Sequence, residues 1–459
     1  MNFSSEWIKT NRLTIKMKRI PILKYLPVTL LMVFIVCFFS SCNSKAQSPP
    51  SKSVDKKPPL EVQEQSEWPC FHGSDYRNKS TETGLLSSWP DEGPELLYTI
   101  SGLGEGYASI SIADGLLYTS GSIDEQTFVF AYDLDGNLVW KKSNGTAWDV
   151  EVYWAKGYDG SRSTPTYDDG VVYHLSEASR LTAYNAKTGE EIWSRNLMKD
   201  FAAEMPDYGF TESVRIDGDK LFVRPAGRKG FQVCLNKTNG KTIWMNNEIP
   251  GTYAYNSGVI SDFGGYRQLI GASSLCYYGV DTETGKMIWK VDFENQYEVN
   301  CTDAVVVDDY VFLSSGEGGG SVLVKLAVSN GKIQAEKVWE TDLMDSYHGG
   351  VIFHKGYFYG SGDRSRGWFS LNMKTGEKMW KSSPRMGSIT YADGMLYLYD
   401  EKGWMSLVKA TPDQFEKAGE FKVPKGGVGP NWAHPVVCGG RLYLRHSDKL
   451  FVYSVSSSI

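Results

Sequence analysis

A short segment that ends in tryptophan recurs along most of this 459-residue chain. Its clearest copy is residues 183–193, AYNAKTGEEIW, and related copies end at Trp140, Trp244, Trp289, Trp339 and Trp380. A weaker copy ends at Phe421, so that successive copies lie 41 to 53 residues apart. Such a period is typical of a repeat that forms one supersecondary unit stacked on its neighbours.

Turn signals divide each repeat into strands. Within a copy, Asp or Asn followed by Thr-Gly or Asn-Gly supplies the positive φ that a hairpin turn needs. Between the copies lies a second signal, Asp-Gly or a close variant before alternating apolar residues, which occurs eight times from Asp114-Gly115 to Gly439-Gly440. Each unit therefore contains four strands. The chain is predicted to be all-β, an eight-bladed β-propeller of four-stranded antiparallel blades.

The eighth unit ends in LFVYSVSSSI and has no Gly–Trp turn, so its outer strand is missing at the C-terminus. The segment that begins at Pro94, PELLYTI, is predicted to supply this strand. Pairing the first strand with the last blade closes the ring and removes two exposed sheet edges. The propeller is expected to cover residues 94–459.

The N-terminus carries the pattern of a lipoprotein signal. Lys18 and Arg19 precede an apolar run from Tyr25 to Ser41, and Cys42 follows. The run is short for a membrane-spanning helix. Residues 1–41 are therefore predicted to be a signal peptide, with translation starting at Met1 or Met17 and lipidation at Cys42. The alternative is an uncleaved membrane anchor, and both interpretations place the rest of the chain outside the cytoplasm.

Two short segments separate this signal from the propeller. Residues 42–67 are rich in Ser, Pro, Lys, Gln and Glu, which predicts a disordered tether. Residues 68–93 begin with the aromatic motif WPCFHG and are expected to form a clasp against the propeller. Cys70 and His72 in this motif are interpreted as packing residues, because the sequence shows no further metal ligands nearby.

Charge and cysteine content limit the possible functions. The formal net charge is −6, and no basic run follows the tether, which argues against a nucleic-acid partner. Five cysteines lie beyond Cys42, so that at most two disulfides could form and one thiol would stay free. The chain is therefore not a disulfide-stapled scaffold.

The repeats resemble the tryptophan-docking repeats of pyrroloquinoline-quinone (PQQ) propellers. The resemblance implies a toroid of eight W-shaped sheets in which tryptophans at the blade junctions join neighbouring sheets. One branch of that superfamily comprises quinoprotein dehydrogenases, which hold PQQ and a calcium ion in the central funnel. Another contains non-catalytic BamB-like lipoproteins of the envelope.

The dehydrogenase branch relies on an adjacent pair of cysteines, and this sequence contains no Cys-Cys pair. The expected function is therefore that of a BamB-like binding or assembly scaffold, lipid-anchored in the cell envelope at the outer membrane. The resemblance implies envelope proteins as partners and no cofactor, and glycans are a second class of expected partner. The alternative is a PQQ- and calcium-dependent alcohol or sugar dehydrogenase.

In a propeller, the residues just before each innermost strand converge on one end of the central channel. We find these positions by counting five or seven residues back from the first residue of each Asp-Gly-like turn. In the fourth unit, whose hairpin is irregular, Tyr255 and Asn256 are taken as the equivalent positions. The side chains selected in this way differ from blade to blade. This variety favours recognition at a funnel mouth. The candidates for the funnel face are Tyr107, Arg162, Glu212, Tyr255, Asn256, Asp303, His348, Trp432 and His434.

Three of these candidates, Glu212, Asn256 and Asp303, carry oxygen atoms suited to a hard cation. Under the dehydrogenase alternative they would serve the ion and base roles. The competing interpretation of all the candidates is that they pair with one another and with channel waters to satisfy a polar axis.

The other candidates suggest an organic ligand. Arg162 and His348 are suited to orient an anionic group, and Tyr107 and Trp432 to stack on a ring. A separate candidate surface is the loop of residues 141–160, whose aromatic residues favour contact with a partner or glycan, with burial over the funnel as the alternative. These aromatic residues are Trp148, Tyr153, Trp154 and Tyr158.

Overall fold

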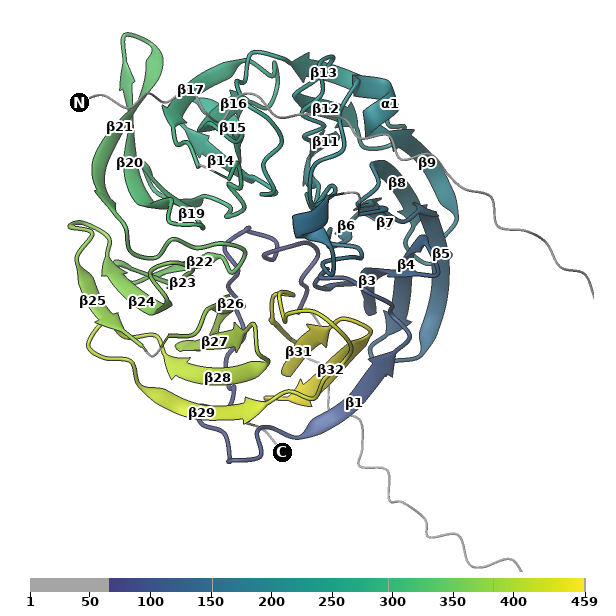
Figure 1. Ribbon diagram of the computed structural model, residues 1–459, viewed down its shortest axis with the longest axis vertical. Coiled ribbons are helices and arrows are strands. Elements are labelled where there is room, and N and C mark those ends of the chain that lie inside the picture. The colour runs from purple at the N-terminus through teal and green to yellow at the C-terminus, as the bar shows by residue number, and fades with distance from the viewer. Residues whose placement is uncertain (1–65, 151, 296, 383, 458–459) are drawn as a thin grey trace, which may run out of the picture. The chain divides into compact units, whose positions relative to one another are not determined.

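The computed structural model describes residues 66–150, 152–295, 297–382 and 384–457. These residues form eight four-stranded antiparallel sheets arranged radially, as predicted (Figure 1). The predicted signal peptide, Cys42 and nearly all of the predicted tether lie outside the described residues. No helix in the described part of the chain is long and apolar enough to cross a membrane.

Seven of the sheets are built from consecutive strands, the first at the channel and the fourth at the rim. The first four are β2 Ser111–Ala113, β3 Leu116–Ile123, β4 Gln126–Asp133, β5 Leu138–Thr146; β6 Thr166–Asp168, β7 Val171–Leu175, β8 Arg180–Asn185, β9 Glu191–Asn196; β10 Arg215–Asp217, β11 Lys220–Val223, β12 Gln232–Asn236, β13 Thr242–Asn246; and β14 Val259–Phe263, β15 Tyr266–Ala272, β16 Cys276–Asp281, β17 Met287–Asp292.

The next three sheets follow the same order along the chain. They are β18 Val305–Val307, β19 Tyr310–Ser315, β20 Gly320–Ser329, β21 Lys332–Thr341; β22 Val351–His354, β23 Tyr357–Gly362, β24 Gly367–Asn372, β25 Lys378–Lys381; and β26 Gly387–Ala392, β27 Met395–Asp400, β28 Trp404–Lys409, β29 Lys417–Lys422. Two short helices lie between sheets, the 3-10 helix η1 Tyr153–Ala155 and α1 Leu197–Phe201.

The eighth sheet closes the ring, which confirms the closure predicted from the sequence. It contains β30 Val436–Cys438, β31 Arg441–His446 and β32 Lys449–Ser454, and its outermost strand is β1 Leu96–Ser101. The antiparallel register pairs Thr99 with Phe451 and Ile100 with Leu450. The free edge of β32 is thereby covered by a strand from the start of the propeller.

Tryptophans join neighbouring blades through their indole N–H groups, which donate to a backbone carbonyl of the next blade at 2.8–2.9 Å. The pairs are Trp140 with Ala186, Trp193 with Lys237, Trp244 with Thr282, Trp339 with Met373 and Trp380 with Thr411. Trp289 differs, because its Nε1 donates to Gln268 Oε1 in its own sheet. The repeated tryptophan is therefore both an apolar anchor and a hydrogen-bond donor between sheets.

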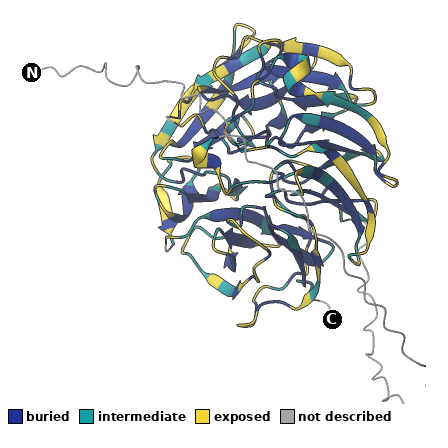
Figure 2. Cartoon of the chain, turned by 45° about the vertical axis from the view of Figure 1, so that its right-hand side comes forward, coloured by how far each residue is buried: buried dark blue, intermediate teal, exposed yellow. Residues whose placement is uncertain are grey.

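The core lies between adjacent sheets. One apolar cluster joins Leu181 of β8 to Leu221 of β11, and another joins Ile352 of β22 to Leu396 of β27. Figure 2 shows the pattern, with buried inner strands and exposed rim strands. Antiparallel sheets that face neighbours on both sides need apolar residues on both faces, which fits the near-continuous apolar character of the middle strands. The cysteines of the described residues are all free.

One expected turn lies a residue away from its predicted place. Asp114 and Gly115 have φ values of 51° and 71°, as a primed hairpin turn requires. In the third blade, however, Asp217 pairs with Lys220, so that the turn is Gly218-Asp219 and not Asp217-Gly218. A shift of one residue moves side chains to the opposite face of a strand. Positions counted back from Asp217 are therefore one residue out of register.

Residues 68–93, called the clasp from here on, run along the channel before β1. Trp68 exchanges two backbone hydrogen bonds of 2.8 Å with Ile112 of β2, and the N–H of Tyr167 in β6 donates to Pro69 O at 2.7 Å. Further along, the N–H of Leu86 donates to Val455 O after β32 at 2.8 Å. In Figure 1 the clasp belongs to the purple trace that crosses the middle of the ring. The clasp thus connects early and late blades.

Candidate functional site

A pocket with a volume of about 130 Å³ opens at the centre of the ring. Its wall is mostly apolar and aromatic, and it includes a residue of the clasp, Phe71. The lining residues are Phe71, Tyr107, Arg162, Tyr208, Thr211, Ser213, Tyr255, Ser257, Val299, Cys301, Tyr347, His348, Trp432 and His434.

Most of the predicted funnel residues come together here. The pocket includes Tyr107, Arg162, Tyr255, His348, Trp432 and His434, and it excludes Glu212, Asn256 and Asp303. The strand geometry explains the convergence, because the chain enters each blade at the channel and equivalent positions of successive blades lie side by side.

A partial ring of hydrogen bonds joins the first five blades around the channel, just before their innermost strands. In each step a backbone N–H of one blade donates to a side-chain oxygen of the next. The bonds run from Ser109 to Thr164 Oγ1 (3.1 Å), from Thr164 to Ser213 Oγ (2.9 Å), from Ser213 to Ser257 Oγ (2.9 Å) and from Ser257 to Asp303 Oδ1 (2.7 Å). The ring positions of the third and fourth blades are thus Ser213 and Ser257, one residue after the predicted Glu212 and Asn256.

Glu212 and Asn256 instead belong to a buried cluster around Arg224. The backbone N–H of Arg224 donates to Glu212 Oε2 at 2.6 Å, and its Nη1 donates to Asn256 Oδ1 at 2.7 Å. The same nitrogen donates to Ala272 O at 2.6 Å. All three side chains are buried. The three side chains are thus engaged with one another, while Arg224 Nε and Asn256 Nδ2 have no hydrogen-bond partner within the described residues.

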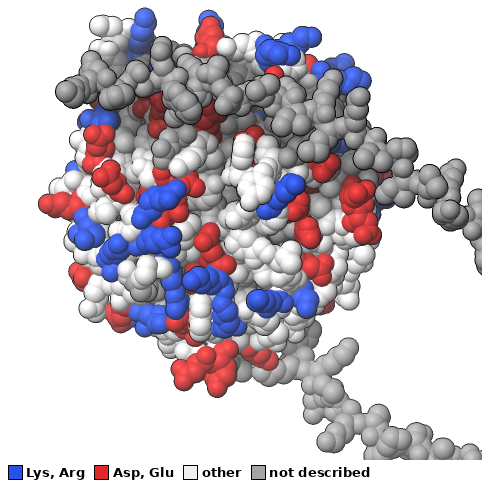
Figure 3. Space-filling model, in the orientation of Figure 1, with Lys and Arg blue, Asp and Glu red and all other residues white. Residues whose placement is uncertain are grey.

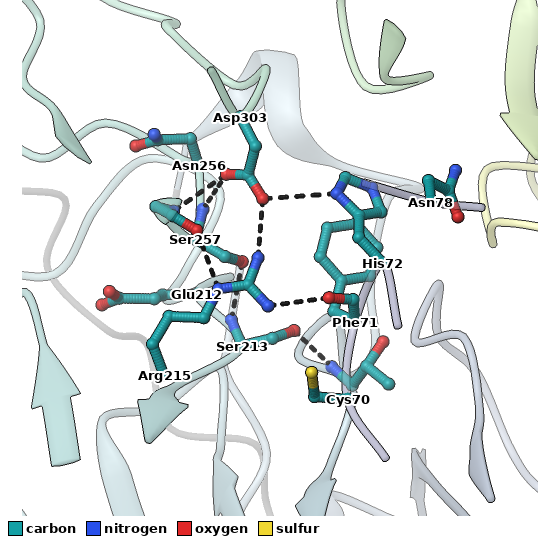
Figure 4. A network of polar contacts seen from close by, with 12 residues as sticks. Cys70, Phe71, His72, Asn78, Glu212, Ser213, Arg215, Asn256, Ser257 and Asp303 are labelled. Carbon is teal, nitrogen blue, oxygen red and sulfur yellow. Dashed lines mark hydrogen bonds and ion pairs between the residues drawn. The ribbon is translucent and has the colours of Figure 1, made fainter. Parts of the chain in front are cut away.

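Asp303 is the centre of the network drawn in Figure 4, where it faces Arg215 and His72. Its Oδ2 accepts from Arg215 Nη2 at 2.8 Å and lies 3.4 Å from His72 Nδ1. Its Oδ1 accepts the N–H groups of Ser257 and Gly258 at 2.7 and 2.9 Å. Burial alone would raise the pKa of Asp303, but the hydrogen bond from His72 and the charge of Arg215 outweigh it and lower the pKa to about 2.

The oxygen atoms proposed as calcium ligands are therefore already engaged by two arginines. Calcium takes six to eight oxygen ligands and gains little from a site whose carboxylates face guanidinium groups. Among the described residues, no group of three or more His, Cys, Asp or Glu side chains is arranged to hold a metal ion. Glu212, Asn256 and Asp303 do not fit a calcium site.

Aromatic rings pack around Trp432 at the pocket wall. Tyr158 stacks on Trp432 with ring centroids 5.2 Å apart and an interplanar angle of 2°, and Tyr107 and His348 each lie 4.9 Å from it. The indole N–H of Trp432 donates to Glu401 Oε1 at 2.6 Å, which fixes the ring. The pocket therefore has a preformed planar surface.

Arg162 is the cation of this pocket. Its guanidinium carbon lies 5.0 Å from the centre of the Tyr107 ring, and its Nη2 donates to the carbonyl oxygen of Tyr158. Burial lowers the pKa of Arg162, and burial also lowers the pKa of His348 to about 3, so that His348 is neutral at physiological pH. The same effect raises the pKa of the Cys301 thiol to about 12. Among these three groups, only Arg162 carries a charge near neutral pH.

The loop of residues 141–160 divides into two parts. Trp148 is buried, and Tyr158 stacks on Trp432. Tyr153 and Trp154 lie on η1 and are 84% and 58% exposed. Contact of this loop with a partner stays a prediction.

Several pocket residues were missed from the sequence. Phe71 comes from the clasp, and Tyr208 and Tyr347 precede the counted positions of their blades. Ser213 was missed because the turn of the third blade was placed one residue early. The pairing of Asp217 with Lys220 places the turn at Gly218-Asp219, whereas the Asp217-Gly218 dipeptide in the sequence predicts a turn one residue earlier.

Outside the pocket, basic and acidic side chains are interspersed on the face shown in Figure 3.

A family model described as "Outer membrane protein assembly factor BamB" matches residues 125–382, more than half of the chain. The structure of BamB from Moraxella catarrhalis has a TM-score of 0.58 at 16% identity, covering 79% of this chain and 99% of that one. A europium-containing methanol dehydrogenase has a TM-score of 0.60 at 11% identity, covering 85% of this chain and 98% of that one. At such identities the likeness shows the fold alone.

Among curated sequences, the quinohemoprotein alcohol dehydrogenase ADH IIB of Pseudomonas putida is 27% identical over 175 residues, which are 36% of this chain and 24% of that protein. The chain spans about a quarter of the length of the quinoprotein relatives that it matches first.

Proposed function

The chain belongs to the family of the outer membrane protein assembly factor BamB, and from this premise we propose that it is a binding or assembly module of the cell envelope. The proposed partners are envelope proteins, with glycans as a second class. The proposal includes anchoring to a membrane, the outer membrane in the first instance, through lipid on Cys42. Replacing Cys42 with Ser is then expected to release the protein from the membrane fraction.

The observation that carries the proposal is the pair of exposed aromatic residues on η1. Tyr153 and Trp154 are 84% and 58% exposed, whereas Tyr158 of the same loop is held against Trp432. The loop is held at Tyr158, and its exposed aromatic residues are accessible to a partner. Tyrosine and tryptophan supply large contact areas at low entropic cost and are enriched at the centres of protein interfaces.

Crosslinking in intact cells tests this surface. The double variant Tyr153→Ala, Trp154→Ala is expected to lose most of the crosslinked partner and to keep the unfolding midpoint of the wild type. Leu138→Ala is the matched control, because Leu138 is 54% exposed on β5 at the rim. Undiminished crosslinking by the double variant would remove η1 from the binding surface.

The alternative function is that of a PQQ- and calcium-dependent alcohol or sugar dehydrogenase. The similarity to the Pseudomonas putida quinohemoprotein supports it. The engagement of Glu212 and Asn256 by Arg224, and of Asp303 by Arg215, weighs against it. Titration of PQQ with and without calcium, together with a dye-linked oxidation assay, decides between the two functions. Calcium-dependent binding with turnover would replace the scaffold proposal.

A further inference from the structure

Two residues on the pocket wall carry buried nitrogen atoms that lack hydrogen-bond partners within the described residues. They are Arg162, through Nε, and His348, through both Nδ1 and Nε2. Buried polar groups in native proteins are nearly always hydrogen-bonded, so that such a cluster in one pocket calls for an explanation. A ligand that brings acceptors into the pocket would supply the missing bonds.

The charge of the pocket indicates the sign of that ligand. Arg162 forms no ion pair with any carboxylate of the described residues, in contrast to Arg215 and Arg224 deeper in the channel. Glu177 is a buried carboxylate that acts on Arg162 through space and raises its pKa against the larger effect of burial, but the two side chains form no ion pair, and Glu177 Oε1 accepts from Ser122 and Thr127. A partly desolvated guanidinium without an ion-paired carboxylate favours an anion, and its planar fork matches a carboxylate.

The size and walls of the pocket indicate what carries the carboxylate. The volume of about 130 Å³ is close to that of an engineered cavity of about 150 Å³ in another protein that binds benzene. The rings of Trp432 and Tyr107 line the pocket beside Arg162, and Tyr158 stacks on Trp432. We propose that this pocket binds a carboxylate carried on a single aromatic ring, with the carboxylate on Arg162 and His348 and the ring against Trp432.

This inference goes beyond the proposed scaffold function and does not depend on it. It also differs from the ligand of the quinoprotein enzymes, because PQQ has three fused rings and three carboxylates. A pocket of one-ring size with one unpaired guanidinium does not match that molecule, and the oxygen atoms considered for calcium are engaged by Arg215 and Arg224.

A ligand with a carboxylate on a single aromatic ring can come from two sources. One is a free aromatic acid, and the other is the C-terminal carboxylate of a chain that ends in an aromatic residue. Benzoate represents the first source, and a short peptide ending in phenylalanine represents the second. Tighter binding of the peptide than of benzoate would assign the chain end, and binding of benzoate alone would assign the free acid.

Calorimetric titration of the full-length protein tests the proposal with benzoate, benzamide, PQQ and the peptide with a free or amidated C-terminus. We expect saturable binding of benzoate or of the free-acid peptide, and at least tenfold weaker binding of the matching neutral amide. The variant Arg162→Gln is expected to weaken carboxylate binding at least tenfold. Arg228→Gln is the matched control, because Arg228 is an exposed arginine that pairs with Glu204 at 3.5 Å, and it is expected to bind as the wild type does.

Three results would overturn the proposal. They are no saturable binding of either carboxylate, equal binding of carboxylate and amide, and tighter binding of PQQ than of both one-ring carboxylates. The comparison of benzoate with benzamide uses the wild type, so that the proposal stays falsifiable even if Arg162→Gln fails to fold. Partner crosslinking through Tyr153 and Trp154 is measured separately, which keeps a failure here distinct from a failure of the scaffold function.

Discussion

Asp303 joins three parts of the molecule at one carboxylate. It accepts hydrogen bonds from the backbone of the fourth blade, pairs with Arg215 of the third blade and contacts His72 of the clasp. Arg215 in turn donates to Phe71 O of the clasp at 2.7 Å and to Gly258 O at 2.8 Å. Because both charges are buried, removing one leaves the other uncompensated.

We predict that Asp303→Asn lowers the free energy of unfolding at neutral pH by about 3 kcal/mol. The pKa of Asp303 is lowered from 3.8 to about 2 on folding, so that its contribution is complete above pH 3.8 and is lost as the pH falls toward 2. That shift corresponds to about 2 kcal/mol. Urea unfolding of wild type and variant across this range should therefore show the difference shrinking at low pH.

Asp262→Asn is the control for this measurement, because the Asp262 side chain is 71% exposed in its pair with Arg267. Its effect should stay within about 0.5 kcal/mol. A difference between wild type and Asp303→Asn that is unchanged from neutral pH down to pH 2 would contradict the assigned network.

The junction between blades depends on the pairing of a tryptophan with the following glycine turn. Trp244 of β13 donates to Thr282 O of the next blade at 2.9 Å, and Gly285 of that blade lies directly over its ring. A Cβ on Gly285 would be 2.4 Å from Trp244 Cε3, and its φ is 70°. Glycine is therefore required at this turn for two independent reasons, the positive φ and the close approach of the ring.

Trp244→Phe is predicted to lower the free energy of unfolding by about 1 to 2 kcal/mol, because the carbonyl of Thr282 loses its donor and the smaller ring leaves space. Trp244→Ala is expected to cost about 3 to 5 kcal/mol. Trp154→Phe, at an exposed position, should change stability by less than about 0.5 kcal/mol. Urea unfolding measures all three, and a Trp244→Phe protein as stable as the wild type would exclude the indole hydrogen bond as a stabilising contact.

Gly285→Ala is predicted to destabilise the protein more than Gly265→Ala does. Both glycines have positive φ, 70° and 82°, but a Cβ on Gly265 meets no atom within 4 Å. Gly265→Ala is the control, and it is expected to cost only the backbone strain, about 1 kcal/mol of stability. The excess cost at Gly285 should fall when Trp244 is replaced with Ala, as a double-mutant cycle would show. Equal costs at the two glycines would indicate that the ring moves aside freely.

At the scale of the whole molecule, β1 completes the ring by pairing with β32. Ile100 of β1 is buried in the same cluster as Leu117 of β3 and Val452 of β32, so that the closure joins the first and last blades through their core as well as through their backbones. An open ring would expose the edge of β32, and exposed edges pair with other chains.

Replacing β1, Leu96–Ser101, with a flexible Gly/Ser segment of equal length is predicted to cause aggregation and to lower the unfolding midpoint. Light scattering and urea unfolding measure the two effects. Leu96→Ser alone is the control, because Leu96 is 46% exposed, and it should behave as the wild type within about 0.5 kcal/mol. A monomeric variant of unchanged stability would show that the β1–β32 pairing is dispensable.

The sequence alone determined the eight four-stranded blades, the closure by the N-terminal strand and the tryptophan that returns in most blades. These follow from local patterns, the alternation of apolar residues, the turn dipeptides and the returning tryptophan, which repeat often enough to be counted. Counting along the repeats also selected Tyr107, Arg162, His348 and Trp432, which the structure brings into one pocket.

Only the tertiary structure decided the rest. The one-residue shift of the third turn places Ser213 and not Glu212 on the ring, because strand pairing sets the register. In the 141–160 loop, Trp148 is buried against Arg162 and Tyr158 stacks on Trp432, which lies far away in the sequence. The engagement of Asp303 by Arg215 and His72 likewise joins three distant segments, and no local pattern encodes such a meeting.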